Sequence, residues 1–237
     1  MTSLMKKSRK KFNKPLTIFV SRELEEDSPF RALETLGHTL IGQSLIDFED
    51  VNINSVPTHE AVFFYSQRAI YPYIKAVGYS MEVEYGVMGP ASQATFLELT
   101  GHKAQIEGQG DYEALASSID TQWADKIVLF PVARRSMKRF KRSLPNVTQE
   151  HVIVYNNTAK EAIDLPACDL VALTSPINVE AYCSSMDMET PLALFSIGQT
   201  TAKKMKAYTS REIFYCEDPS EANLYRLVDK FISSLAP

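Results

Sequence analysis

Cysteine is scarce: the 237 residues contain only three, widely spaced and without a Cys-x-x-Cys pair, at Cys168, Cys183 and Cys216. An odd number at such spacing argues against a disulfide framework and favours a reducing compartment, so we expect a cytoplasmic protein. The four histidines are isolated from one another and from the cysteines. No cluster of metal ligands is therefore predicted, and no metal is expected.

Long apolar runs and an excess of basic charge are also missing. No stretch approaches the ~18 apolar residues that a membrane-spanning helix requires, so no membrane association is expected. The 25 basic side chains are outnumbered by 29 acidic ones, which argues against a general nucleic-acid binder. Residues 1–14 are basic but lack the apolar stretch of a secretory signal, and we predict a flexible basic tail there.

Short apolar segments alternate with amphipathic ones along the whole chain. We predict strands at 16–20, 39–45, 61–65, 85–88, 103–106, 126–130, 150–155, 170–173, 192–197 and 212–216. Helices are predicted to open at Ser28, Ser66, Gly89, Asp111, Ser136, Ser175, Gly198 and Ser220, where capping residues, glycine or proline precede amphipathic segments. This alternation predicts an α/β protein with parallel sheets covered by helices on both faces.

The spacing of the strand–helix turns repeats. Ser66 precedes Gly89 by 23 residues, and Ser175 precedes Gly198 by the same interval. A shift of 109 residues places strand on strand and helix on helix from 62 to 120, although only seven of these fifty-nine positions are identical. The common phase, rather than the identity, predicts two similar α/β halves.

The two halves need not be contiguous. Residues 15–48 form a strand–helix–strand unit too small for a sheet of its own, and 164–237 needs additional strands. We therefore predict one discontinuous domain from 15–48 and 164–237, with 51–155 inserted as a second domain. The polar stretches 47–56 and 156–166 would connect them, and a cleft between the domains would be the natural ligand site.

The order and spacing of these turns resemble those of uroporphyrinogen-III synthases over about residues 15–235. In that family an opening strand ends in Thr-Arg-Pro, two strands run into Thr-Ser turns, two helices open with Gly-Pro-x-Thr-Ala, and Val-Tyr-x-Thr ends the middle region. The segments that match here, in that order, are Ser21-Arg22-Glu23, Tyr65–Ile70 and Thr174–Val179, Gly89–Ser92 and Gly198–Ala202, and Val154–Thr158.

The resemblance implies two α/β domains joined by a two-stranded connector, the first formed by both termini. It also implies that the linear tetrapyrrole hydroxymethylbilane is closed to uroporphyrinogen III, with loss of water and inversion of the last ring. No cofactor is required for that reaction, and we expect a monomer acting on a small molecule. The runner-up is a catalytically inactive relative that serves as a two-domain module for small anions.

The implied substrate is a polycarboxylate, and helix N-termini at strand–helix turns offer unpaired N–H groups to anions. In parallel sheets these turns gather at the carboxyl edge. The predicted substrate-binding residues are Arg22, Ser66, Gln67, Arg68, Gly89, Pro90, Ala91, Ser175, Pro176, Gly198, Gln199, Thr200 and Thr201. For the turn residues Ser66, Gly89, Ser175 and Gly198 the alternative is plain capping of a helix.

Tyr155 matches the tyrosine that the family is thought to use to assist departure of the hydroxyl. A phenol can donate a proton or a hydrogen bond at neutral pH. The alternative is a strand-end tyrosine packed against the connector. The basic segment 132–142 is interpreted either as an electropositive rim for a polyanion or as a solvated helix face.

Several positions depart from the family pattern and leave open whether activity is reduced: Glu23, Tyr65, Gln199, and Pro131-Val132-Ala133 where the family has Arg-Gly. Other enzyme classes find less support. The chain has no Gly-x-Gly-x-x-Gly after its first strand, no phosphate-binding P-loop and no Gly-x-Ser-x-Gly hydrolase turn.

Overall fold

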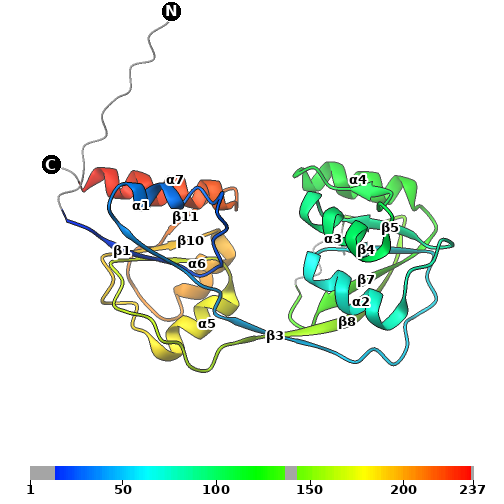
Figure 1. Ribbon diagram of the computed structural model, residues 1–237, viewed down its shortest axis with the longest axis horizontal. Coiled ribbons are helices and arrows are strands. Elements are labelled where there is room, and N and C mark those ends of the chain that lie inside the picture. Colours follow the sequence, from blue (N-terminus) through cyan, green and yellow to red (C-terminus); the bar gives the residue numbers. More distant parts are fainter. Residues whose placement is uncertain (1–13, 137–142, 236–237) are drawn as a thin grey trace, which may run out of the picture. The chain divides into compact units, whose positions relative to one another are not determined.

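The computed structural model describes residues 14–136 and 143–235 (Figure 1). The chain divides into two compact units. Unit 1 takes the chain up to Ile46 and again from Thr158, and unit 2 is Asp47–Asn157. Each unit contains one sheet, and the α/β prediction with parallel sheets is confirmed. Most of the predicted tail (1–13) and of the predicted basic helix (137–142) lies outside the described residues.

Unit 1 is built on a parallel sheet in the order β11-β10-β9-β1-β2. Ile18 lies opposite Leu170, so that strands from the two ends of the chain pair directly. The strands are β1 (Thr17–Val20), β2 (Thr39–Gly42), β9 (Leu170–Leu173), β10 (Ala193–Ser196) and β11 (Phe214–Tyr215).

Helices cover both faces of this sheet because successive strand residues point to opposite faces. Ile18 and Val20 pack with residues of α1 (Arg31–Thr35) and α7 (Glu221–Ser234). Phe19, between them, packs with residues of α5 (Pro176–Ser185) and α6 (Gln199–Met205). In Figure 1, α1 and α7 accordingly lie together on one side of the sheet.

Unit 2 is built on a sheet in the order β3-β8-β7-β4-β5-β6. From β8 to β6 all neighbours are parallel. The Val51 N–H donates to the Val154 carbonyl and the Lys160 N–H to the Leu45 carbonyl, so β3 and β8 run antiparallel. The strands are β3 (Ile46–Asp50), β4 (Ala61–Phe64), β5 (Glu84–Val87), β6 (Ile106–Glu107), β7 (Ile127–Ala133) and β8 (Thr148–Ala159).

The helices of unit 2 also lie on both faces of its sheet. The 3-10 turn η1 (Gln67–Ala69), α2 (Ile70–Val77) and α3 (Pro90–Thr100) supply core residues that pack with Val62, Phe64 and Leu129. On the other face, α4 (Tyr112–Gln122) packs with Phe63 and Phe130. Figure 1 shows α4 on the opposite side of these strands from α2.

The 109-residue shift recurs in the structure. It carries the bounds of β4 onto β9 and those of β5 onto β10, and Asp111 and Ser220 both cap the helices that follow. Both sheets have the same order of equivalent strands. However, the equivalents of β7 and β8 are β1 and β2, at the start of the chain. Unit 1 is therefore arranged as a circular permutation of unit 2.

Several predicted boundaries were wrong. The first α-helix begins at Arg31, because the residues after Ser28 form a tighter turn: the Arg31 N–H donates to the Ser28 carbonyl and the Ala32 N–H to the Pro29 carbonyl. Strand β7 continues beyond 130 to Ala133. The chain crosses between the units at 46/47 and 157/158, at the edge of the predicted connector 47–56 and within the predicted connector 156–166, and both crossings lie in strands, β3 and β8.

Candidate active site

In unit 2, the predicted binding residues lie where β4 and β5 end. The Ser66 hydroxyl accepts the Arg68 N–H at 3.3 Å and caps η1. Gln67 Nε2 donates to Thr95 Oγ1 at 2.6 Å, which ties this turn to α3. Gly89 caps α3 without a side chain, with Pro90 at the first helical position and Pro90 and Ala91 exposed. The unpaired backbone N–H groups at the start of η1 and of α3 therefore lie at this edge of the sheet.

Tyr155 lies on β8 beside the end of β7. It pairs with Ala133, whereas Val132 pairs with Ile153, so β8 carries one extra residue between these two pairs. This bulge lets the neighbouring Val154 and Tyr155 both enter the core beneath α2 and α3. The Tyr155 side chain is 7% exposed. Tyr155 is therefore a packed residue near the end of a strand, as the alternative interpretation expected. It also lies at the end of the sheet where a role in catalysis would place it.

Two further side chains join Tyr155 on the same face. The Phe48 ring on β3 lies 6.0 Å from the Tyr155 ring, centroid to centroid. The guanidinium carbon of Arg68 lies 4.0 Å from the centroid of the Phe48 ring. Arg68 was among the predicted residues, but Phe48 was not. Phe48 lies in the stretch 47–56, which was interpreted as a polar connection between the domains. A single aromatic residue in a polar stretch was the feature that could have indicated a site residue there.

Arg134 and Asn156 form a second polar group at this end of the sheet, also missed from the sequence. Arg134 Nε donates to Asn156 Oδ1 at 2.7 Å, and Asn156 Nδ2 lies 3.5 Å from Glu49 Oε2. Asn156 follows Tyr155 and Glu49 follows Phe48, so this group belongs to the opposite face of the strands. Arg134 was assigned to the basic segment after a strand that ended too early.

In unit 1, the predicted turns also lie at the carboxyl ends of strands. The Ser175 hydroxyl caps α5 by accepting the Asn178 N–H at 3.1 Å, with Pro176 at the first helical position. Gln199 and Thr200 are exposed at the start of α6, whereas Thr201 is buried, with 3% exposure. A binding role for the Thr201 side chain is therefore not favoured.

Gly198 and Arg22 have structural partners in unit 1. A Cβ on Gly198 would lie 2.9 Å from Pro219 Cγ, so close packing accounts for glycine there. Arg22 Nη1 forms an ion pair with Glu221 Oε2 at 3.0 Å. The other oxygen of that carboxylate accepts the Ser28 hydroxyl. Arg22 would have to exchange this pair to bind a substrate carboxylate.

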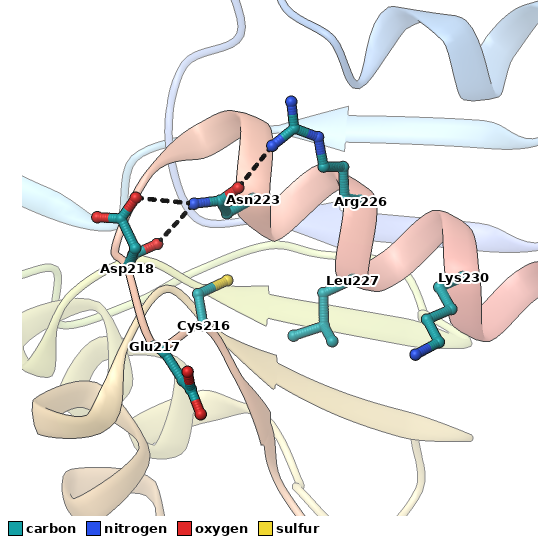
Figure 2. A pocket seen from close by; sticks show the side chains of 7 residues that line it. All are labelled: Cys216, Glu217, Asp218, Asn223, Arg226, Leu227 and Lys230. Carbon is teal, nitrogen blue, oxygen red and sulfur yellow. Dashed lines mark hydrogen bonds between the residues drawn. The ribbon is translucent and has the colours of Figure 1, made fainter.

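Two pockets among the described residues are lined by none of the predicted site residues. One, of about 410 Å³, is lined by Cys216, Glu217, Asp218, Asn223, Arg226, Leu227 and Lys230. Figure 2 shows that three of its polar side chains bond to one another: Asn223 donates to Asp218 and accepts from Arg226. Burial, with Asp218 nearby, raises the pKa of the Cys216 thiol. Asp218, Asn223 and Arg226 are thus already engaged with one another.

Two searches of the described ranges bear on other site types. Residues 14–136 and 143–235 contain no group of three or more His, Cys, Asp or Glu placed to bind a metal ion. Within the same ranges, none of the helices has the length and apolar character needed to cross a membrane.

A family model described as uroporphyrinogen-III synthase HemD matches residues 30–226 of the chain. The chain belongs to this family. The crystal structure of uroporphyrinogen-III synthetase from Helicobacter pylori is similar to it, with a TM-score of 0.65 and 15% sequence identity. The match covers 92% of this chain and all of that one, and at this identity it establishes the fold alone. No curated protein sequence matches the chain significantly.

The departures from the HemD family pattern fit local structure. Glu23 Oε1 accepts the Ser44 N–H at 3.1 Å. The Tyr65 ring stacks on Phe130 at 5.2 Å. Pro131 lies in the part of β7 beyond the paired residues of β4, where it pairs only with β8 and a missing donor is tolerated. None of these three positions disturbs the face that carries Tyr155.

Proposed function

We propose that this chain is a uroporphyrinogen-III synthase, a lyase that closes hydroxymethylbilane to uroporphyrinogen III with loss of water and inversion of the last ring. Membership of the HemD family supports the proposal, and neither comparison favours the inactive anion-binding relative. We further propose a monomer that needs no cofactor. A cytoplasmic location is consistent with three free cysteines in the described chain.

The observation that carries the proposal is the grouping of Tyr155, Phe48 and Arg68 on one face of unit 2. Expulsion of a hydroxyl group from a polycarboxylate needs a hydrogen-bond donor near the leaving oxygen and a cation near a carboxylate. A tyrosine hydroxyl and an arginine guanidinium provide these two functions. Both come from residues at the carboxyl end of the sheet, where ligands of parallel sheets bind.

The rest of the reaction depends more on positioning the substrate than on further catalytic groups. The open N-terminus of α3, in the same unit as Tyr155, offers N–H groups to the acetate and propionate arms. Holding the two ends of the linear tetrapyrrole together would favour ring closure through proximity. The Tyr155 hydroxyl would donate its proton to the leaving oxygen, which departs as water, and the proton that the pyrrole carbon loses on ring closure would restore the phenol.

The test is a coupled assay in which the purified chain meets freshly generated hydroxymethylbilane and the oxidised products are separated by isomer. The uncatalysed reaction is expected to give the symmetric type I ring. Predominant type III product would establish the synthase. Type I alone, at the uncatalysed rate, would overturn the proposal and leave the anion-binding relative as the better account.

A further inference from the structure

The contact between Arg68 and Phe48 places an exposed guanidinium against an aromatic face. Arg68 is exposed, and its guanidinium carbon lies 4.0 Å from the ring centroid. In the described part of the chain, no carboxylate forms a salt bridge with it. A guanidinium at this distance is attracted by the electrons of the ring. The ring therefore supplies the contact that an acidic side chain would otherwise make.

The acidic neighbours of Phe48 are kept away from Arg68 by the pleat of β3. Asp47 and Glu49 flank Phe48 in sequence and point to the other face of the strand. Glu49 lies near Asn156 on that face, at 3.5 Å from its amide nitrogen. Asp50 shares the face of Phe48 by the same alternation and lines a pocket with Lys75 of α2, but within the described residues it forms no ion pair with Arg68. Arg68 therefore has no carboxylate of the described chain bound to it on the face that Tyr155 shares.

Stacking on Phe48 also leaves the N–H donors of the Arg68 guanidinium accessible. The contact with Phe48 occupies the flat face, whereas the N–H donors lie in the plane and point outward. A carboxylate can then approach the edge and accept two parallel hydrogen bonds. A long side chain held against a ring loses less conformational freedom when such a ligand binds.

We propose that Phe48 is a positioning residue: it holds the Arg68 guanidinium beside Tyr155, so that Arg68 binds one carboxylate of the substrate next to the reacting end. This inference rests on the proposed function. It assigns Phe48 a role in binding, transmitted through Arg68, and assigns Arg68 a carboxylate ligand.

Three substitutions test the pair. Phe48→Leu keeps an apolar side chain but removes the aromatic face, Phe48→Tyr keeps the face, and Arg68→Ala removes the cation. Phe48→Leu is expected to raise KM for hydroxymethylbilane about two- to fivefold, the range that an exposed cation–π contact supports. Phe48→Tyr, which keeps the aromatic face, should leave KM at the wild-type value. Arg68→Ala should raise KM about tenfold, as expected for loss of a hydrogen bond to a charged group.

The double variant separates positioning from packing. If Phe48 acts through Arg68, adding Phe48→Leu to Arg68→Ala causes no further rise in KM. Multiplied effects would overturn the proposal, and so would a fall in kcat without a change in KM, which would indicate disturbed packing of Tyr155. The matched control is Tyr71→Leu, which removes a similar contact, with Lys75 Nζ 5.6 Å from the Tyr71 ring, and should leave KM unchanged.

A binding measurement decides the inference independently of catalysis. Uroporphyrin III, a stable polycarboxylate, is titrated against the wild-type chain and the variants, and affinity is followed by porphyrin absorbance. The same order of effects is expected in Kd. A wild-type chain that forms only type I ring overturns the proposed function, while Kd still reports on Phe48. Unchanged uroporphyrin affinity in both Phe48→Leu and Arg68→Ala, or no wild-type binding together with no type III product, overturns the inference.

Discussion

The indole Nε1–H of Trp123 donates to a carboxylate oxygen of Glu84 at 2.7 Å. Trp123 is fully buried after α4, and the other Glu84 oxygen accepts from Lys126. The Lys126 hydrogen bond is the largest cause that lowers the pKa of Glu84. One carboxylate thus satisfies a buried donor and an ammonium group.

Glu84→Leu is expected to destabilise unit 2 by about 1–3 kcal/mol, because the indole N–H loses its acceptor. Glu84→Gln keeps an amide oxygen for the indole and should cost less. Lys126→Met, the control, removes only the partly exposed ion pair, which is worth about 0–1 kcal/mol. Trp123 is the only tryptophan, so its fluorescence during urea unfolding reports on unit 2. Equal losses for Glu84→Leu and Lys126→Met would contradict this account.

Tyr155→Phe tests the hydroxyl without changing the ring that packs against Phe48. We expect kcat to fall about 10²-fold, at the low end of what a positioned acid contributes, while KM stays near the wild-type value. The control is Tyr85→Phe, which removes the acceptor of the Ser80 N–H elsewhere in unit 2 and should leave kcat unchanged. Full activity in Tyr155→Phe would show that this residue serves packing alone.

Arg134 is the matched comparison for Arg68, because both are exposed arginines at the same end of the unit 2 sheet. Arg134 reaches Asn156 on the face opposite Tyr155. We therefore expect Arg134→Ala to change KM for hydroxymethylbilane by less than about twofold, against about tenfold for Arg68→Ala. Steady-state kinetics at one fixed ionic strength makes the comparison. Equal effects would mean that general positive charge, rather than the Tyr155 face, attracts the substrate.

The sequence pattern predicted the fold better than the site, for a physical reason. Strand and helix periodicity and helix caps are local, so the turn residues Asp111, Ser175 and Ser220 were identified correctly as caps. The common phase of the two halves is read from these local turn signals, and the same 109-residue shift recurs in the strand bounds. The predicted end of β7 at Phe130 was wrong, because the strand continues along β8 past its last pair with β4.

The grouping of Phe48, Arg68 and Tyr155 depends on contacts between segments far apart in the chain. A single sequence carries no record of which β3 residue meets β8, and one residue of slip would place Glu49 there instead. The bulge at Val154 adds a further uncertainty, since it alters which side chains share a face. For the same reason the sequence could not predict that Arg22 pairs with Glu221.

Arg211 ties a loop of unit 1 together. Its guanidinium donates to the carbonyls of Met188 and Glu189, at 3.0 and 2.9 Å, and to those of Pro191 and Leu192. Lysine cannot span these acceptors from a single nitrogen, so Arg211→Lys should destabilise unit 1 by about 1–3 kcal/mol. Thermal unfolding followed by circular dichroism measures the loss. Arg226→Lys, at an exposed position on α7, is the control and should leave Tm nearly unchanged.

His38 makes the stability of unit 1 depend on pH. It is 8% exposed, and its Nδ1 accepts the Leu16 N–H at 3.2 Å, which requires the neutral ring. Burial lowers the pKa of His38. The unfolded chain therefore binds a proton more readily than the folded one, so stability is complete above about pH 6.5 and falls as pH drops below it.

The corresponding measurement is Tm between about pH 7.5 and about pH 5.5, in the wild type and in His38→Asn. The asparagine Oδ1 can still accept the Leu16 N–H but does not titrate, so the variant should lose part of the decline in Tm toward acid. His102→Asn, at an exposed position, should retain the wild-type decline. Parallel curves for wild type and His38→Asn would show that other groups set the acid sensitivity, because a non-titrating side chain at position 38 removes any contribution of the His38 ring.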